Sequence, residues 1–301
     1  MYVDSHFHVD SLLEVPADVL SLVVGNSVVG IASCHSRKAF DLSNDLRKAL
    51  DDYYEEGIAG DLTFRELLKN RNRPHVLLSF GIHPQEPDMS LVQQLLELAS
   101  AGSIHAIGEC GFDFWEDRPS CMMNEAAVKT QTEVFEAQLD IAIEFFMPVI
   151  LHLRKAQRFL FSYAKKLAKL PAVILHSWNG SANEAQDFLR HVPNAYFSFG
   201  TSLLNGNKKA FATAGILPLN RILTESDAPW QPPRAEPMPG AKLCREYSSP
   251  EDLPRIVSFI TRARKLHGIF LPGFWDEAIE PSAIEETEKA VENNFFEVFR
   301  A

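Results

Sequence analysis

Residues 128–154 read VKTQTEVFEAQLDIAIEFFMPVILHLR and join a helix-like segment to a strand-like one. In the first segment, apolar side chains recur at intervals of three, four or seven: Val128, Phe135, Leu139, Ala142 and Phe146. This spacing predicts a helix with one apolar face. Met147 and Pro148 end that helix, because proline disfavours helical geometry in the residue before it. The apolar run that follows is short enough to be a strand, and it ends in a histidine.

Seven other short apolar or β-branched runs are separated by stretches long enough for helices. The eight runs are Tyr2–His6, Ser27–Ser33, Val76–Ile82, Ile104–Glu109, Pro148–His152, Ala172–His176, Ala195–Phe199 and Arg221–Asp227. Strands that alternate with helices in this way predict a parallel sheet that is buried on both faces. Eight of them predict an α/β protein with a closed (β/α)8 TIM barrel, whose active site lies at the C-terminal ends of the strands. With no repeat and no break in composition, we expect one domain over residues 1–301.

Two segments are longer than a barrel requires. Residues 36–74 contain enough helix-forming sequence for two helices where one would suffice. Residues 228–254 are rich in proline and follow the eighth run, so we expect them to lie over the barrel mouth as a cap. Long loops on that face are where barrel enzymes commonly select their substrates.

The composition is that of an ordinary globular protein. The chain has 301 residues, 46% of them hydrophobic, and a formal net charge of −11, which disfavours non-specific coating of duplex nucleic acid. The cysteines form no C-x-x-C pair, which favours a reducing compartment over a disulfide framework or a zinc ribbon. The first residues, MYVDSHFHVD, do not resemble a secretion signal, and the longest apolar stretch is too short to span a membrane. We therefore expect a soluble cytoplasmic protein without membrane association.

Histidines and acids occupy the ends of five of the eight runs. They are His6, His8, Glu109, His152, His176 and Asp227. Each alone has an ordinary structural explanation, such as a core histidine or a turn-capping aspartate. In a barrel, however, the strand ends open on one face, so these side chains converge, and His6 and His8 point the same way because side chains alternate along a strand. Six donor side chains are more than a single tetrahedral metal site with an open position can use. They suit two divalent ions that share Glu109.

An ordered set of motifs resembles that of the TatD family of metal-dependent hydrolases, within the amidohydrolase superfamily. The motifs are HFH (6–8), GIHP (81–84), GECGFDF (108–114), FEAQL (135–139), PVILHLR (148–154), HSWNGS (176–181), TESDAP (224–229) and NFFEVF (294–299). Together they extend over nearly the whole chain. The resemblance therefore implies the barrel fold and a metal-dependent hydrolase of the DNase type.

The resemblance also assigns roles to individual residues. One ion would take His6, His8, Glu109 and Asp227, and the other would take Glu109, His152 and His176. Asp227 is then the expected proton acceptor, and Glu109 is the bridging catalytic carboxylate. His83, Arg154 and Arg245 are expected substrate contacts, because a guanidinium or imidazole near the mouth can bind phosphate oxygens. The identity of the ions stays open between Zn²⁺, Mg²⁺ and Mn²⁺.

Departures from the family pattern affect the expected substrate contacts. Trp178 stands where the family usually has Phe, and Trp230 follows the eighth run. Both could stack on a nucleobase, which is worth about 1–3 kcal/mol per base in single-strand binders, or could pack at the barrel rim. His35 lies just past the second run and can line the pocket, but no motif supports a role for it.

Two enzymatic functions are consistent with these features. The first is a phosphodiesterase of the deoxyribonuclease type that acts on nucleic acid ends, or on a small phosphodiester, by metal-activated water. The alternative is hydrolysis of a small ester, lactone or amide at the same site. A binding scaffold without catalysis is disfavoured, because converging buried charges are costly to retain. No residue pattern indicates an obligate protein partner. Basic residues are expected near the mouth or on neighbouring helices: Arg154, Lys155, Arg158, Lys208, Lys209, Arg234 and Lys242.

Overall fold

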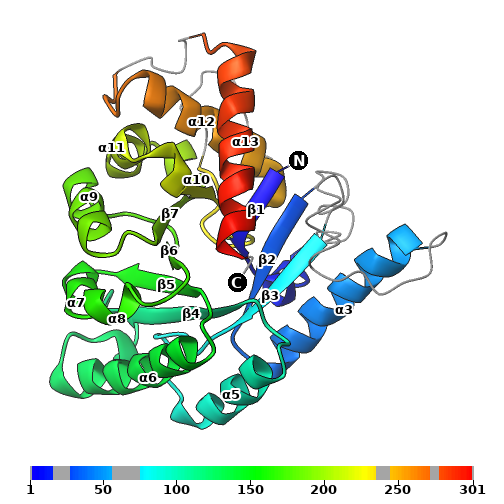
Figure 1. Cartoon of the computed structure of the whole chain (residues 1–301), viewed down its shortest axis with the longest axis vertical. Helices are drawn as coiled ribbons and strands as arrows, with labels where there is room; N and C mark the ends of the chain where they lie inside the picture. The colour runs from blue at the N-terminus through cyan, green and yellow to red at the C-terminus, as the bar shows by residue number, and fades with distance from the viewer. Residues whose placement is uncertain (1, 16–27, 56–74, 235–244, 272–277, 300–301) are drawn as a thin grey trace.

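The computed structural model describes residues 2–15, 28–55, 75–234, 245–271 and 278–299. Within these ranges the strands form one eight-stranded sheet in the order β1 to β8, and neighbouring strands are parallel (Figure 1). The strands are β1 (Tyr2–Phe7), β2 (Val28–Cys34), β3 (His75–Phe80), β4 (Ala106–Asp113), β5 (Val149–Arg154), β6 (Val173–Leu175), β7 (Ala195–Phe199) and β8 (Ile222–Thr224). All eight expected strands are present.

The helices lie outside the sheet. In Figure 1, α5 and α6 follow its lower edge, α7 to α9 its left side, and α13 lies in front of β1. The α-helices are α1 (Val9–Leu12), α3 (Arg37–Glu55), α5 (Val92–Ser100), α6 (Glu125–Glu144), α7 (Gln157–Ser162), α8 (Ala164–Leu167), α9 (Ala182–His191), α10 (Thr201–Leu204), α11 (Lys208–Ile216), α12 (Leu253–Lys265) and α13 (Pro281–Val298). Short 3₁₀ turns are η1 (Met89–Leu91), η2 (Pro119–Cys121), η3 (Leu219–Arg221) and η4 (Pro250–Asp252).

The two ends of the sheet meet where the chain leaves β8. The backbone N–H of Asp227 donates to the carbonyl oxygen of His6 at 2.9 Å, and that of His8 donates to Ala228 at 2.8 Å. The hydroxyl of Thr224 donates to the carbonyl oxygen of Val3 at 2.7 Å. These bonds bring the end of β8 against β1 and leave the barrel nearly closed, so the predicted (β/α)8 fold is confirmed.

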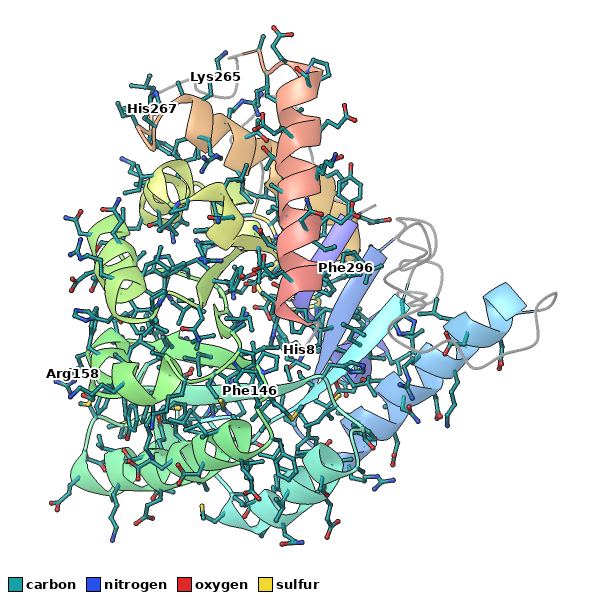
Figure 2. The ribbon with its side chains drawn as sticks, in the orientation of Figure 1. His8, Phe146, Arg158, Lys265, His267 and Phe296 are labelled. Carbon is teal, nitrogen blue, oxygen red and sulfur yellow. The ribbon has the colours of Figure 1, made fainter. Side chains whose placement is uncertain are left out.

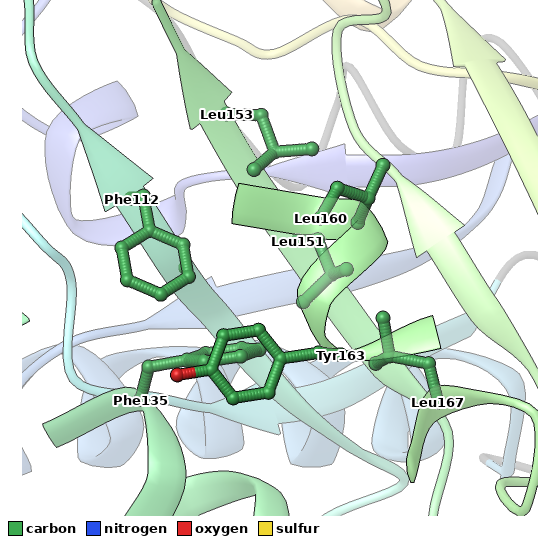
Figure 3. Close-up of a pocket in the computed structure, with 8 residues that line it drawn as sticks. Phe112, Phe135, Leu151, Leu153, Leu160, Tyr163 and Leu167 are labelled. Carbon is green, nitrogen blue, oxygen red and sulfur yellow. The ribbon is translucent and has the colours of Figure 1, made fainter. Parts of the chain in front are cut away.

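The core lies between the strands and the surrounding helices. Figure 3 shows one part of it, in which Phe112 of β4 and Leu151 of β5 face Phe135 of α6 and Tyr163, which joins α7 to α8. The rings of Phe112 and Phe135 lie 4.9 Å apart, and Tyr163 meets Phe135 edge-on at the same distance. Burial of this apolar face explains why the apolar positions of residues 128–142 form a helix here.

The expected helix is shorter at its end than its pattern suggested. Helix α6 stops at Glu144. Phe146, which is labelled in Figure 2, has a positive φ of 50° and is 59% exposed. The prediction that Phe146 lies on the buried stripe is therefore wrong. A left-handed residue cannot continue a helix, so the chain turns before Met147 and enters β5.

Strand β4 is longer than the run that predicted it, because it continues to Asp113. Glu109 therefore lies inside the strand and not at its end, which places it deeper in the barrel. Gly111 allows β4 to lie close to β5. Its φ is 136°, and a Cβ at this position would overlap the carbonyl oxygen of His152.

The two long segments fall partly within the described structure. In residues 36–74 the first expected helix is α3, and residues 56–74 lie outside the described ranges. In residues 228–254, Trp230, Gln231 and Arg234 line the cavity at the barrel mouth, while residues 235–244 lie outside the description. Among the helices described, none is both long and apolar enough to cross a membrane.

Candidate active site

The six residues expected to bind metal come together at one end of the barrel, and all are buried. His6 is on β1 and His8 follows it, while Glu109 is inside β4 and His152 inside β5. His176 comes directly after β6, and Asp227 follows β8 with a φ of 52°. A left-handed aspartate is uncommon and is consistent with a functional position.

Glu109 lies at the centre of the cluster, and its two oxygens face different groups. Around Oε2 lie Nε2 of His6 at 3.2 Å, Nε2 of His35 at 3.5 Å and Nε2 of His8 at 4.0 Å. The Nε2 atoms of His6 and His8 are 3.1 Å apart, as alternation along the strand predicted. Asp227 joins the same side, with Oδ1 3.5 Å from Nε2 of His8 and 3.7 Å from that of His6.

The other oxygen of Glu109 faces three more histidines. Nδ1 of His152 lies 2.5 Å from Oε1, Nε2 of His176 lies at 3.3 Å, and Nε2 of His83 lies at 3.5 Å. Glu109 thus separates two groups of donor atoms, which is the arrangement that a bridging carboxylate requires.

Two further carboxylates contact the ring nitrogens of His152 and His176 that point away from Glu109. Asp113 lies 3.0 Å from Nε2 of His152, and Glu225 lies 3.1 Å from Nδ1 of His176. Asp113 also accepts a hydrogen bond from the side chain of Gln85 at 2.8 Å. Carboxylates that bind the outer nitrogen of an imidazole fix its orientation and increase its basicity as a ligand.

The pKa values of the cluster are set by burial and by neighbouring groups, many of opposite charge. Burial would raise the pKa of Glu109, but the surrounding histidines, His176 and His83 foremost, hold it well below its usual value. Burial would likewise lower the pKa of His176, but Glu225 and Glu109 raise it to about 10. Burial and the neighbouring His176 lower the pKa of His6 to about 4. Glu109 is therefore held in the anionic form that binds cations.

The donor set fits a divalent cation. Four groups of three His, Asp or Glu donors, each including His6, His8 or Glu109, have their ligand atoms within 4.8 Å of one another. Among the histidines around Glu109, two buried nitrogens, Nδ1 of His6 and Nε2 of His35, have no hydrogen-bond partner in the described ranges. Buried polar atoms without hydrogen-bond partners are rare in proteins. A bound ion would give such a partner to a buried nitrogen that faces the cluster.

Two of the expected substrate contacts line the cavity beside this cluster. The backbone N–H of Gln85 donates to Nδ1 of His83 at 3.2 Å, so the other nitrogen of a neutral ring carries the hydrogen. Arg154 donates to Asp113 at 3.2 Å, and its guanidinium lies over the ring of Trp115 at 5.0 Å. Their contact with substrate stays a prediction.

The structure places the other two expected substrate contacts outside the set of residues that line the cavity. Trp178 is 3% exposed and meets Phe197 edge-on at 5.1 Å, so its ring belongs to the core and cannot stack on a base. Arg245 donates to Asp252 at 2.9 Å and lies outside the set of residues that line the cavity. Its charge is already paired with acids of its own loop, Asp252 and Glu251.

Several functional candidates were missed or undervalued. Glu225 and Asp113 lie within quoted motifs, yet nothing in the motif shows that they orient histidines. Trp115 follows β4, is 51% exposed and lines the cavity. His35 follows β2, which is the same strand-end signal that selected the six expected ligands.

Comparison with known proteins agrees with this architecture. The family model for TatD related DNase matches residues 3–300. The chain belongs to the TatD-related DNase family. One relative, the 3'-5' ssDNA/RNA exonuclease TatD of Enterobacter lignolyticus (strain SCF1), is 34% identical over 207 residues, which are 66% of this chain and 74% of that protein. The protein of the same name from Escherichia coli (strain K12) is 31% identical over 192 residues, which are 61% of this chain and 68% of its own.

Solved TatD structures share the fold. The TatD homologue YJJV from Escherichia coli K12 superposes with a TM-score of 0.70 at 20% identity, covering 100% of this chain and 98% of its own. A TatD family hydrolase from Entamoeba histolytica gives a TM-score of 0.69 at 14% identity, covering 99% of this chain and 97% of its own. The chain is a metal-dependent hydrolase of the TatD family.

Proposed function

We propose that the chain is an exonuclease that removes nucleotides from the 3' ends of single-stranded DNA or RNA. Two relatives that are 34% and 33% identical to the chain, over 66% and 64% of its length, are named for this activity. The observation that carries the proposal is the convergence of imidazoles and carboxylates on both oxygens of Glu109, inside a cavity that opens at the barrel mouth.

Two divalent ions are proposed at this site. His6, His8, Asp227 and Oε2 of Glu109 would hold one, and His152, His176 and Oε1 of Glu109 would hold the other. Ions bound there would lower the pKa of a coordinated water and offset the charge of a phosphate. The donors are rich in imidazole, which favours Zn²⁺ or another transition ion over Mg²⁺.

The side chains around the ions would complete the reaction. A water would add to phosphorus as the bond from phosphorus to the 3' oxygen of the shortened strand breaks. Asp227 would accept a proton of that water, and the leaving oxygen would take up a proton from solvent to become the new 3' hydroxyl. Asp227 is positioned for this because Gln231 donates to its Oδ2 at 2.6 Å, which leaves Oδ1 toward the cluster. The Nε2–H of neutral His83 faces the site and can donate to a phosphate oxygen.

The cavity suits the end of a single strand. Its volume of about 1250 Å³ is larger than the roughly 300–1,000 Å³ of sites for drug-sized molecules. Trp115 and Trp230 are both about half exposed and line it, together with Arg118, Arg154 and Arg234. Exposed aromatic rings beside cationic groups are how proteins bind unpaired nucleotides without a basic overall charge.

The alternative, hydrolysis of a small ester, lactone or amide, is not favoured, because the relatives of the chain are named as nucleases. A cytoplasmic location remains part of the proposal. Cys34, Cys110 and Cys121 are free thiols in the described structure, as expected in a reducing compartment.

The direct test uses metal-loaded protein and single-stranded oligonucleotides labelled at the 5' end. We expect a ladder that shortens stepwise from the 3' end, no cleavage of a circular single strand, and loss of activity in His152→Ala. His191→Ala is the matched control, because His191 is exposed at the end of α9. Cutting of the circle, or no release of nucleotides from DNA or RNA by folded, metal-loaded protein, would refute the proposal.

A further inference from the structure

His35 has the same position in the fold as the expected metal ligands. It follows β2 at the C-terminal face of the barrel, lines the cavity, and places its Nε2 3.5 Å from Oε2 of Glu109. The rings of His8 and His35 are 5.4 Å apart. The family motifs in this chain do not include His35.

Hydrogen bonding shows which nitrogen of His35 carries the hydrogen. Nδ1 lies 3.4 Å from the carbonyl oxygen of Gly81, and because a carbonyl can only accept, Nδ1 must donate. Nε2 then presents a lone pair, and it is buried without a hydrogen-bond partner in the described structure. An imidazole that donates one N–H to a backbone carbonyl and turns its other nitrogen inward is the usual arrangement of a metal ligand.

His83 provides an internal comparison. Its Nε2 is also 3.5 Å from Glu109, but its Nδ1 accepts a hydrogen bond from the backbone N–H of Gln85. In the neutral ring Nε2 of His83 therefore carries a hydrogen and can donate but not bind a cation. Two histidines at the same distance from one carboxylate thus have opposite roles.

We propose that His35 is a further metal ligand on the Oε2 side of Glu109. Two ligand atoms on one ion with bonds of about 2.1 Å lie roughly 3.0–3.4 Å apart, close to the 3.5 Å between His35 and Glu109. The ligand atoms of His8, His35 and Glu109 all lie within 4.8 Å of one another. This inference rests on the proposed metal centre.

A third imidazole on this side changes which ion the site prefers. His6, His8 and His35 would supply three nitrogens beside the oxygens of Glu109 and Asp227. Imidazole nitrogens suit Zn²⁺ and similar ions, whereas Mg²⁺ prefers oxygen ligands and retains its waters. His35 therefore increases the selectivity of the site for transition ions over Mg²⁺.

The test measures metal binding without substrate, so it is independent of the exonuclease proposal. Zn²⁺ affinity is measured by competition with a chromogenic chelator, Mg²⁺ affinity by calorimetry, and the ligand field by the visible spectrum of bound Co²⁺. We expect His35→Ala to weaken Zn²⁺ binding at one position by about tenfold or more, to change the Co²⁺ spectrum, and to alter Mg²⁺ affinity far less. His35→Glu should restore a donor and shift the preference toward Mn²⁺ and Mg²⁺.

His191→Ala is again the control and should match the parent protein. Circular dichroism shows whether each variant is folded, and His35→Gln, which retains polarity at this position, replaces His35→Ala if the latter is not. Unchanged Zn²⁺ affinity and an unchanged Co²⁺ spectrum in a folded variant would overturn the proposal.

Discussion

Glu225 accepts a hydrogen bond from Nδ1 of His176 at 3.1 Å, and the opposite nitrogen of that ring faces Oε1 of Glu109 at 3.3 Å. The same carboxylate accepts the backbone N–H of Ser177 at 2.8 Å, where the chain adopts a φ of 47°. Glu225 therefore fixes both the ring orientation of His176 and the turn that follows it.

Replacement of this carboxylate tests its orienting role. Glu225→Gln keeps the shape but removes the charge that raises the pKa of His176. We expect Zn²⁺ affinity to fall by about 10- to 100-fold at one position, as measured by chelator competition. Glu144→Gln, an exposed position on α6, is the control. Affinity equal to that of the parent protein would show that Glu225 has only a structural role.

Trp115 is expected to hold a base of the substrate. It is exposed at the cavity rim, with the cations of Arg154 and Lys155 within 5.0 Å of its ring centre. Trp115→Ala should raise KM for oligonucleotides by about 5- to 100-fold with little change in kcat, since stacking is worth about 1–3 kcal/mol per base. Trp115→Phe should recover most of the loss. A strand whose 3'-terminal nucleotides lack their bases is the control substrate, and an equal rise in KM there would contradict stacking.

Gln138 connects helix α6 to the loop that carries His83. Its side chain is buried, accepts the backbone N–H of Ile82 at 2.7 Å and donates to the carbonyl oxygen of Ile82 at 3.1 Å. Gln138→Leu leaves both backbone groups without partners, so we expect the free energy of unfolding to fall by about 2–4 kcal/mol in urea titrations. Gln93→Leu, on an exposed face of α5, should change it by less than about 0.5 kcal/mol. A similar small effect for Gln138→Leu would contradict this role.

His105 is expected to make stability depend on pH. Its Nδ1 accepts the N–H of Leu78 at 3.2 Å, and burial lowers its pKa to about 4. The unfolded chain, with a histidine pKa of about 6.5, binds more protons between these values, so the stabilisation is complete above pH ~6.5 and is lost as the pH falls toward 4. Because His105 is partly exposed, we expect a loss of about 1–2 kcal/mol.

The comparison for this prediction is His105→Asn, which keeps an acceptor for Leu78 but does not titrate. Urea unfolding of both proteins from pH 7 to 4, with metal chelated, isolates the contribution of His105. Parallel stability curves over this range would contradict the prediction.

The convergence of the six ligand candidates was predictable because it depends on topology. Parallel strands of a barrel present their C-terminal ends on one face, and alternation aligns His6 with His8, whose Nε2 atoms are 3.1 Å apart. The predicted position of Glu109 at the end of a strand was less accurate, because β4 continues to Asp113 and Glu109 lies inside it.

Contacts that depend on one backbone torsion or on one distant partner were not predictable. The left-handed turn at Ser177 redirects Trp178 into the core against Phe197. Phe146 is exposed for a similar reason, because its own φ is positive. The roles of Glu225 and Asp113 require knowledge of which ring each one faces, and residue spacing contains no such information.

Anomalous diffraction from crystals soaked in Mn²⁺ or Zn²⁺ tests the metal centre most directly. We expect one peak beside Oε2 of Glu109, toward His6, His8 and Asp227, and another beside Oε1, toward His152 and His176. Maps with no peak at Glu109, or with peaks only at other places on the molecule, would contradict it.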